Sequence, residues 1–111
     1  MPASDPFATG GFTVDPNQTF PALTVPKGKV FVLTDVIVFP LVEKSNLEFV
    51  VRYRIEENNL TKFQYNTVGT AVNWSQHFTS GIKYGPGTVN VVNTNFSTGR
   101  TGFQLIGYFK P

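Results

Sequence analysis

The stretch Leu47-Glu-Phe-Val-Val-Arg-Tyr-Arg-Ile55 decides between a helical and a β fold. Every second residue from Leu47 to Ile55 is apolar, and the residues between them are polar except Val50. This period of two is typical of a half-buried strand, whereas a helical face would include Arg54 and Asn58. The sequence therefore predicts a strand over residues 47–55.

The residues that follow predict a hairpin. Residues 56–59, Glu-Glu-Asn-Asn, have the composition of a turn, and residues 60–67 read as the partner strand. Phe63 and Tyr65 belong on the core side of that strand. Side-chain parity then requires an odd number of connecting residues or a β-bulge.

Residues 29–39 carry the strongest β signal of the chain, because β-branched and aromatic residues favour a pleated sheet. Strict alternation puts Phe31, Leu33, Asp35, Ile37 and Phe39 on one face, and Val30, Val32, Thr34, Val36 and Val38 on the other. Both faces are largely apolar, yet a two-layer sandwich buries only one face of each strand. We therefore expect the N-terminal arm, a long loop or another subunit to cover the second face.

Further strands are expected at residues 18–25, 73–79, 88–94 and 102–109, with turns at 25–28 and 85–87 and a loop at 97–100. Residues 1–16 show no sustained period and contain several prolines and glycines, which predicts an extended arm. About seven or eight short strands at this spacing indicate a single antiparallel β-sandwich of jelly-roll or other Greek-key type. We expect an arm over residues 1–16 and a β-sandwich domain over residues 17–111.

The composition excludes several classes of site. The 111 residues suit one domain, with a net charge of +2, one histidine and no cysteine. Thiol chemistry, disulfides and sites built from several histidines are therefore excluded, and we expect no metal and no cofactor. We also expect no nucleic-acid partner, no membrane insertion and no secretory signal, because clustered basic residues, a long apolar run and a basic leader are missing.

Part of the chain resembles a known group of proteins. The stretch Val25-Pro-Lys-Gly-Lys-Val-Phe-Val-Leu-Thr-Asp-Val36 is similar to a hairpin of small bacterial and phage β-sandwich proteins of unassigned function. Phe78-Thr-Ser-Gly-Ile82, Gly85-Pro-Gly87 and Gly107-Tyr-Phe109 resemble their later strands. The resemblance covers about half of the chain, supports the β-sandwich and implies no activity.

Ser75, His77 and Ser80 are the nucleophile and base candidates. Ser75 and His77 lie two residues apart on one strand face, so their side chains can approach each other. A hydrolase also needs an orienting carboxylate and oxyanion donors, and no Gly-x-Ser-x-Gly motif is present. We expect His77 to be a solvated residue of a polar face.

Asp35 lies within an otherwise apolar strand. One interpretation is a catalytic or ligand-binding carboxylate with a raised pKa. The other is structural: a buried ion pair with an arginine, or an inward charge that discourages edge pairing.

Two further groups are candidate binding residues. Arg52, Arg54 and Lys62 fall on the outward faces of the predicted hairpin, where Glu48 relieves their charge, and they form either an anion or acidic-partner site or simply solvated charges. Trp74, Tyr84 and Tyr108 are the aromatic residues expected to be exposed, where they suit sugar stacking, a subunit interface or a cap on the core.

These observations predict a non-enzymatic binding or assembly β-sandwich, a homo-oligomeric structural or adhesion-type protein associated with a phage or virion. The first alternative is a carbohydrate-binding module that uses the exposed aromatic residues. The second is a small hydrolase centred on His77. An arm that exchanges between subunits, or that packs across a neighbour, would supply the missing cover of residues 29–39.

Overall fold

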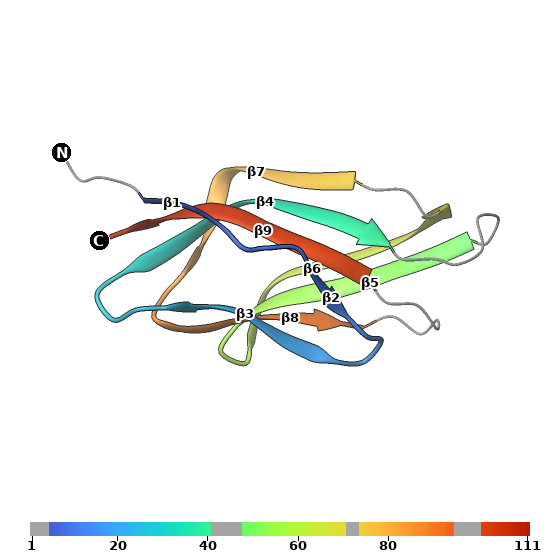
Figure 1. Cartoon of the computed structure of the whole chain (residues 1–111), viewed down its shortest axis with the longest axis horizontal. Coiled ribbons are helices and arrows are strands. Elements are labelled where there is room, and N and C mark those ends of the chain that lie inside the picture. The colour runs from blue at the N-terminus through green and yellow to red at the C-terminus, as the bar shows by residue number, and fades with distance from the viewer. Residues whose placement is uncertain (1–4, 41–47, 71–73, 95–100) are drawn as a thin grey trace.

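The computed structural model describes residues 5–40, 48–70, 74–94 and 101–111, with the backbone alone at 40, 48–51, 66–70 and 74. The described residues form nine strands and no helix (Figure 1). The strands are β1 (Asp5–Ala8), β2 (Phe12–Val14), β3 (Thr19–Val25), β4 (Val30–Pro40), β5 (Glu48–Glu57), β6 (Leu60–Thr70), β7 (Trp74–Tyr84), β8 (Gly87–Asn93) and β9 (Thr101–Lys110). None of these residues belongs to a helix long and apolar enough to span a membrane.

Two antiparallel sheets pack face to face, as the sequence predicts. The first sheet has the order β1-β9-β4-β7, with β2 beside β1 on the same edge of β9, and the second has the order β3-β8-β5-β6. When β1 and β2 are counted as one interrupted strand, eight strands alternate between the sheets except for the β5–β6 hairpin. This is the strand order of a jelly roll.

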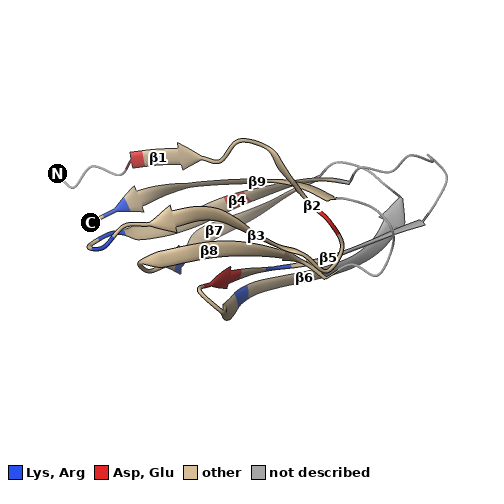
Figure 2. Cartoon of the chain, turned by 60° about the horizontal axis from the view of Figure 1, so that its bottom comes forward, with Lys and Arg blue, Asp and Glu red and all other residues tan. Residues whose placement is uncertain are grey.

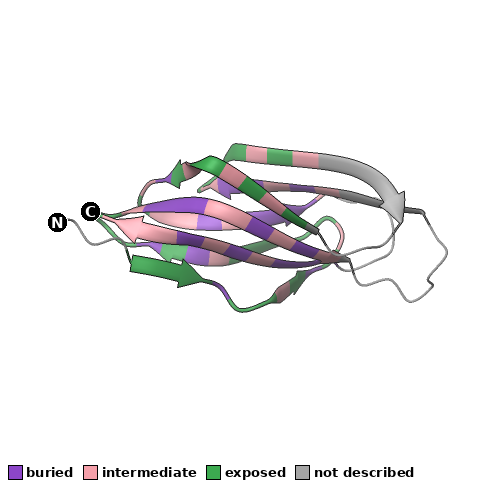
Figure 3. Cartoon of the chain, turned by 90° about the horizontal axis from the view of Figure 1, so that it is seen from above, coloured by how far each residue is buried: buried purple, intermediate pink, exposed green. Residues whose placement is uncertain are grey.

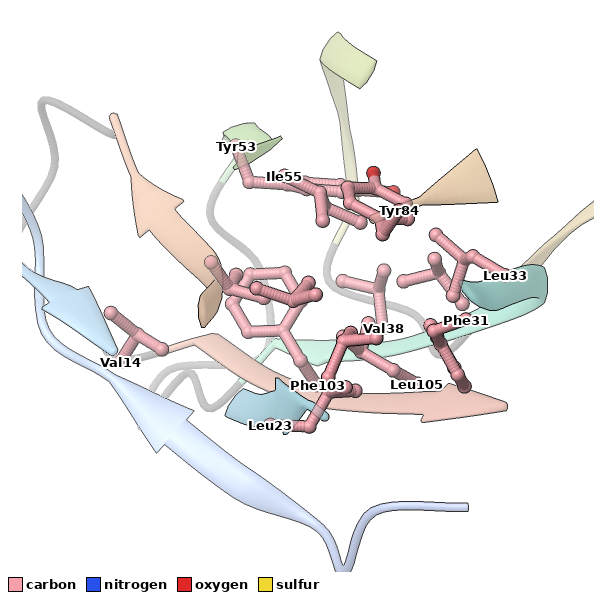
Figure 4. Close-up of a cluster of buried hydrophobic side chains, with 14 residues drawn as sticks. Val14, Leu23, Phe31, Leu33, Val38, Tyr53, Ile55, Tyr84, Phe103 and Leu105 are labelled. Atoms are coloured by element: carbon pink, nitrogen blue, oxygen red, sulfur yellow. The ribbon is translucent and has the colours of Figure 1, made fainter. Parts of the chain in front are cut away.

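The core lies between the sheets and is built from alternating residues of both (Figure 4). Tyr53 and Ile55 of β5 face Phe103 and Leu105 of β9, and all four side chains are buried. The strand predicted over residues 47–55 is thus confirmed at its described side chains. Leu47, Phe49 and Val51 lie outside the residues whose side chains are described.

The predicted parity of the β5–β6 hairpin is also confirmed. The register shifts between Ile55 and Glu56, so that Ile55 is opposite Phe63 while Glu56 is opposite Thr61. Lys62 is the extra residue of this β-bulge. Because of it, Phe63 and Tyr65 pack against the core although the connecting turn is short.

The two faces of β4 differ from those that strict alternation predicts. Against β9 the register shifts between Leu33 and Asp35 because Thr34 is an extra residue of a β-bulge. Against β7 the extra residues lie on the other strand, where residues 78–81 separate the partners of Leu33 and Asp35. Phe31 and Leu33 therefore share the core side with Val36 and Val38, which are fully buried. The prediction that Asp35 shares a face with Phe31 and Leu33 is wrong, since the bulge turns Asp35 outward.

The outer face of β4 is covered in part by this same chain. Val32 is buried, and a Cβ at Gly81 of β7 would overlap its side chain, so the β7 backbone lies directly on it. A Cβ at Gly102 would likewise overlap the ring of Phe39. A second subunit is therefore not needed to bury Val32, and two glycines give the close approach instead.

Candidate functional site

The β-bulge at Thr34 creates a polar cluster on the outer face of the first sheet. Asp35 becomes the cross-strand partner of His77 on β7 and of Ile106 on β9. Oδ1 of Asp35 lies 2.8 Å from Nδ1 of His77, and the Thr34 hydroxyl lies 2.9 Å from Oδ2 of Asp35 and 3.2 Å from the Ile106 carbonyl oxygen. The cluster thus joins the three adjacent strands β9, β4 and β7.

The Asp35–His77 pair is a surface interaction. The side chains are 33% and 64% exposed, respectively, so water screens much of their attraction. The hydrogen bond from His77 holds the pKa of Asp35 below its ordinary value of 3.8, against the opposing effect of burial. The prediction of a raised pKa is wrong, and so is that of an arginine partner, because the bulge keeps the carboxylate near water and beside an imidazole.

The cluster supplies one missing part of the hydrolase alternative, since Asp35 holds His77 as an orienting carboxylate would. Among the described side chains, Asp35 is the sole hydrogen-bond partner of the His77 ring. Ser75 and Ser80 are exposed and neither hydroxyl binds the ring. The arrangement is a dyad without an attached nucleophile, and its histidine is solvated as expected.

The structure separates Lys62 from Arg54, with which it was predicted to form a patch. Arg54 lies on the outer face of the second sheet, where its Nε binds Oε2 of Glu56 at 2.9 Å. Lys62 sits in the β6 bulge and turns the other way, with Nζ 2.7 Å from Oε2 of Glu57 and 5.7 Å from the centre of the Tyr84 ring. Both signs of charge occur together at this hairpin (Figure 2), so Arg52, Arg54 and Lys62 do not form one positive patch.

The contacts of Lys62 connect the two sheets. Its Nζ also donates to the carbonyl oxygen of Lys83 on β7 at 2.7 Å, and the amide of Gly85 donates to Oε1 of Glu57 at 3.2 Å. The hydrogen bond from Lys62 holds the pKa of Glu57 below its ordinary value, and that from the Gly85 amide acts in the same direction. This network is a structural bridge between the β5–β6 hairpin and the end of β7.

The expectation that Tyr84 is exposed is wrong. Its side chain is 0% exposed and belongs to the buried cluster of Figure 4, because Tyr84 ends β7 on the core side. It offers no free ring face to a sugar. Tyr108 lies on the outer face of the first sheet and is partly exposed, while the side chain of Trp74 lies outside the described residues.

The outer faces of the two sheets differ in chemistry. The first sheet presents partly exposed apolar side chains at Val30, Ile37, Phe39, Ile106 and Tyr108. The second presents Thr19, Thr24, Thr88, Asn90, Arg54 and Gln64. A surface that binds another protein needs apolar area at its centre, which the first sheet supplies, whereas these described outer residues of the second sheet are polar.

Residues of the predicted arm lie along the free edge of β9. In β1, Asp5 is opposite Phe109 and Ala8 is opposite Ile106. Phe7 packs against Phe31 and Phe109, with ring centroids 6.1 and 5.3 Å apart. The described strands β1 and β2 therefore close an edge of the first sheet.

The sequence pattern predicts no functional role for Phe7, Ile106 or Gly107. Of the three, Gly107 alone carries a signal in the sequence, because a glycine inside a strand often marks a close approach of another segment. Phe7 is the register partner of Gly107, and a Cβ at position 107 would overlap the Val32 carbonyl oxygen.

The described residues contain no group of three or more histidine or acidic side chains that could hold a metal ion. No protein-family model matches the chain, and comparison with curated proteins finds no relative.

Proposed function

We propose that this protein is a non-enzymatic assembly module that associates with further copies of itself through the outer face of its first sheet. The observation that carries the proposal is the row of partly exposed apolar side chains across β9 and β4, with Ile37 and Ile106 at its centre. Burial of such area is the main favourable contribution to association. The few charges of this face include the Asp35–His77 pair, which is already neutralised within the chain when the imidazole is protonated.

A second copy is the occupant that fits this face best. The arm strand β1 adds to an edge of the same sheet, and its backbone pairing with β9 could be made identically with the β9 of another copy. Closed symmetric homo-oligomers reuse one surface on each subunit, so a single apolar face is sufficient.

The two alternatives have weaker support. The carbohydrate-binding alternative can no longer use Tyr84 as a stacking ring, because that ring is in the core. Hydrolysis would use His77 and Asp35, but the described residues provide no hydroxyl bound to the imidazole. Both remain distinguishable from assembly by experiment, since neither requires self-association.

The proposal is tested by the mass of the native particle in light scattering, together with one substitution on each sheet. Ile37→Lys places a charge at the centre of the apolar face and is expected to dissociate the oligomer. Thr24→Lys adds the same charge to the polar outer face of β3 and should leave the mass unchanged. Thermal melting checks that both variants are folded. A wild-type particle with the mass of one chain across the accessible concentration range overturns the proposal.

A further inference from the structure

We infer that β1 exchanges between two copies of this chain, hinging at Gly10–Gly11, so that each β1 pairs with the β9 of the other copy. This inference rests on the proposed self-association and names its partner and its interface. The structure divides the arm into a half that is fixed to its own core and a half that is held only at an edge.

The fixed half is β2. Val14 is a buried member of the core cluster, and the ring of Phe12 stacks on Phe20 of β3 at 4.5 Å with an interplanar angle of 17°. Phe12 also lies 6.0 Å from Phe103 of β9, measured between ring centroids. Because β2 contacts both sheets, it cannot leave without opening the sandwich.

The separable half is β1. All four of its residues are exposed, and it pairs with β9 alone (Figure 3). Its one anchoring side chain is Phe7, which is 37% exposed and occupies a shallow site made by Phe31 and Phe109. Asp5 adds a solvent-exposed ion pair with Lys29 at 3.7 Å, and such pairs contribute little to stability.

Two glycines separate β1 from β2, and the conformation of the single chain, with β1 on its own β9, requires a glycine at neither position. Gly10 and Gly11 are not among the residues with positive φ, so their backbone could be that of any residue. A Cβ added at Gly10 would have nothing within 4 Å, and one at Gly11 would make an ordinary contact with the Phe39 ring at 3.4 Å. What glycine adds at these positions is the freedom to take another path, which is the property a hinge requires.

The contacts of Thr9 would be transferred together with β1. Its amide donates to the Leu105 carbonyl oxygen at 3.0 Å, and its hydroxyl accepts from the Leu105 amide at 3.1 Å. The Gln104 side chain donates to the Thr9 carbonyl oxygen at 3.0 Å. In the exchanged form the same bonds form on β9 of the second copy, so bonding is conserved. The unfavourable entropy of association is then offset by burial of the apolar outer faces against each other.

Cysteine cross-linking tests the exchange directly, because the natural chain has no cysteine. Thr9 is hydrogen-bonded to Leu105, so the neighbouring pair Ala8–Ile106 is a non-hydrogen-bonded pair, in which Cα atoms lie about 4.5 Å apart. That spacing suits a disulfide. Ala8→Cys and Ile106→Cys are made as two separate single variants with distinguishable tags, which are unfolded, refolded together and oxidised with glutathione.

A disulfide between the two different chains is expected, because exchange brings residue 8 of one copy beside residue 106 of another at the spacing of a strand pair. The double variant Ala8→Cys/Ile106→Cys is expected to run as a covalent oligomer without reductant. The matched control mixes Thr24→Cys with Ile106→Cys, since residue 24 lies on the other sheet and should give no specific hetero-disulfide.

The inference is overturned if the double variant closes its disulfide within single chains and the mixed single variants stay unlinked. When the native particle is nevertheless an oligomer, only the arm exchange has failed and the proposed function stands. When the native particle is a monomer, both fail together. Thermal melting of the reduced variants confirms that the readout comes from folded protein.

Discussion

Asp35 and His77 are cross-strand partners on the outer face of the first sheet, with Oδ1 of Asp35 2.8 Å from Nδ1 of His77. They meet because Thr34 is an extra residue of β4 against β9, which turns Asp35 away from the core, and because the register shift of β7 at residues 78–81 brings His77 opposite Asp35. The pair therefore reports directly on the β-bulge. Its energetic contribution is expected to be small, because both side chains are substantially exposed.

Asp35→Asn is expected to lower the free energy of unfolding by less than about 1 kcal/mol at pH 6. The pKa of Asp35 is lower in the folded chain than its ordinary value of 3.8, so this contribution is present above that value. It is lost as the pH falls through the folded pKa, and the two proteins should then become equally stable. Urea unfolding at pH 6 and near pH 2 measures the difference. His77→Gln removes the same bond and serves as the matched variant; an undiminished difference in acid contradicts the assignment.

The fold was largely predictable, because its information is local. The alternation around Tyr53 and Ile55 and the turn at Pro26–Gly28 identify strands without knowledge of their neighbours. The faces of β4 were not predictable, since no glycine or proline of β4 itself lies beside Thr34 and the bulge depends on the pairing with β9. The side-chain parity of the β5–β6 hairpin predicts a bulge but not its position at Lys62. The separation of Lys62 from Arg54, which follows from that position, was therefore not predicted.

Gly81→Ala is expected to destabilise the protein by about 2–3 kcal/mol. Gly81 has a φ of 72°, a left-handed conformation that alanine adopts only with strain, and the new Cβ would overlap Val32. Gly10→Ala is the matched control, since its Cβ meets nothing and its φ is not positive. That variant should be unchanged or slightly more stable. Equal melting temperatures for the two variants would show that β7 does not lie on Val32 as described.

Lys62→Met is expected to cost about 1–2 kcal/mol near neutral pH, because it leaves the half-buried Glu57 carboxylate without its cation. The methionine side chain preserves contact with the Tyr84 ring. The pKa of Glu57 is lowered in the folded chain, so the stabilisation is present above its ordinary value of 4.5 and disappears as the pH falls through the folded pKa. Chemical unfolding at pH 7 and pH 3 measures the difference in free energy of unfolding between the wild type and the variant at each pH. Lys27→Met, in the exposed β3–β4 turn, is the control; a cost that is the same at both pH values would contradict the ion pair.

Tyr84→Phe is expected to raise the free energy of unfolding by about 0.5–1 kcal/mol. The hydroxyls of Tyr84 and Tyr53 are buried and have no hydrogen-bond partner among the described residues, so removing either relieves an unpaired polar group. Burial raises the pKa of both phenols, which agrees with poor solvation. Tyr108→Phe, on the partly exposed outer face, should change little. Destabilisation by Tyr84→Phe would mean that its hydroxyl is hydrogen-bonded in solution.

Phe7→Ala is expected to loosen β1 selectively. The substitution removes the ring contacts with Phe31 and Phe109, and a loss of about 1 kcal/mol in local opening free energy corresponds to roughly fivefold faster exchange. Native-state hydrogen exchange by NMR should show this acceleration at the Thr9 amide, which donates to the Leu105 carbonyl oxygen, and at the Leu105 amide, which donates to the Thr9 hydroxyl. Amides of the β2–β9 ladder should keep their wild-type rates, because Val14 remains in the core. Equal acceleration on both ladders would mean that the arm opens as one unit, and a hinge at Gly10–Gly11 could not then release β1 alone.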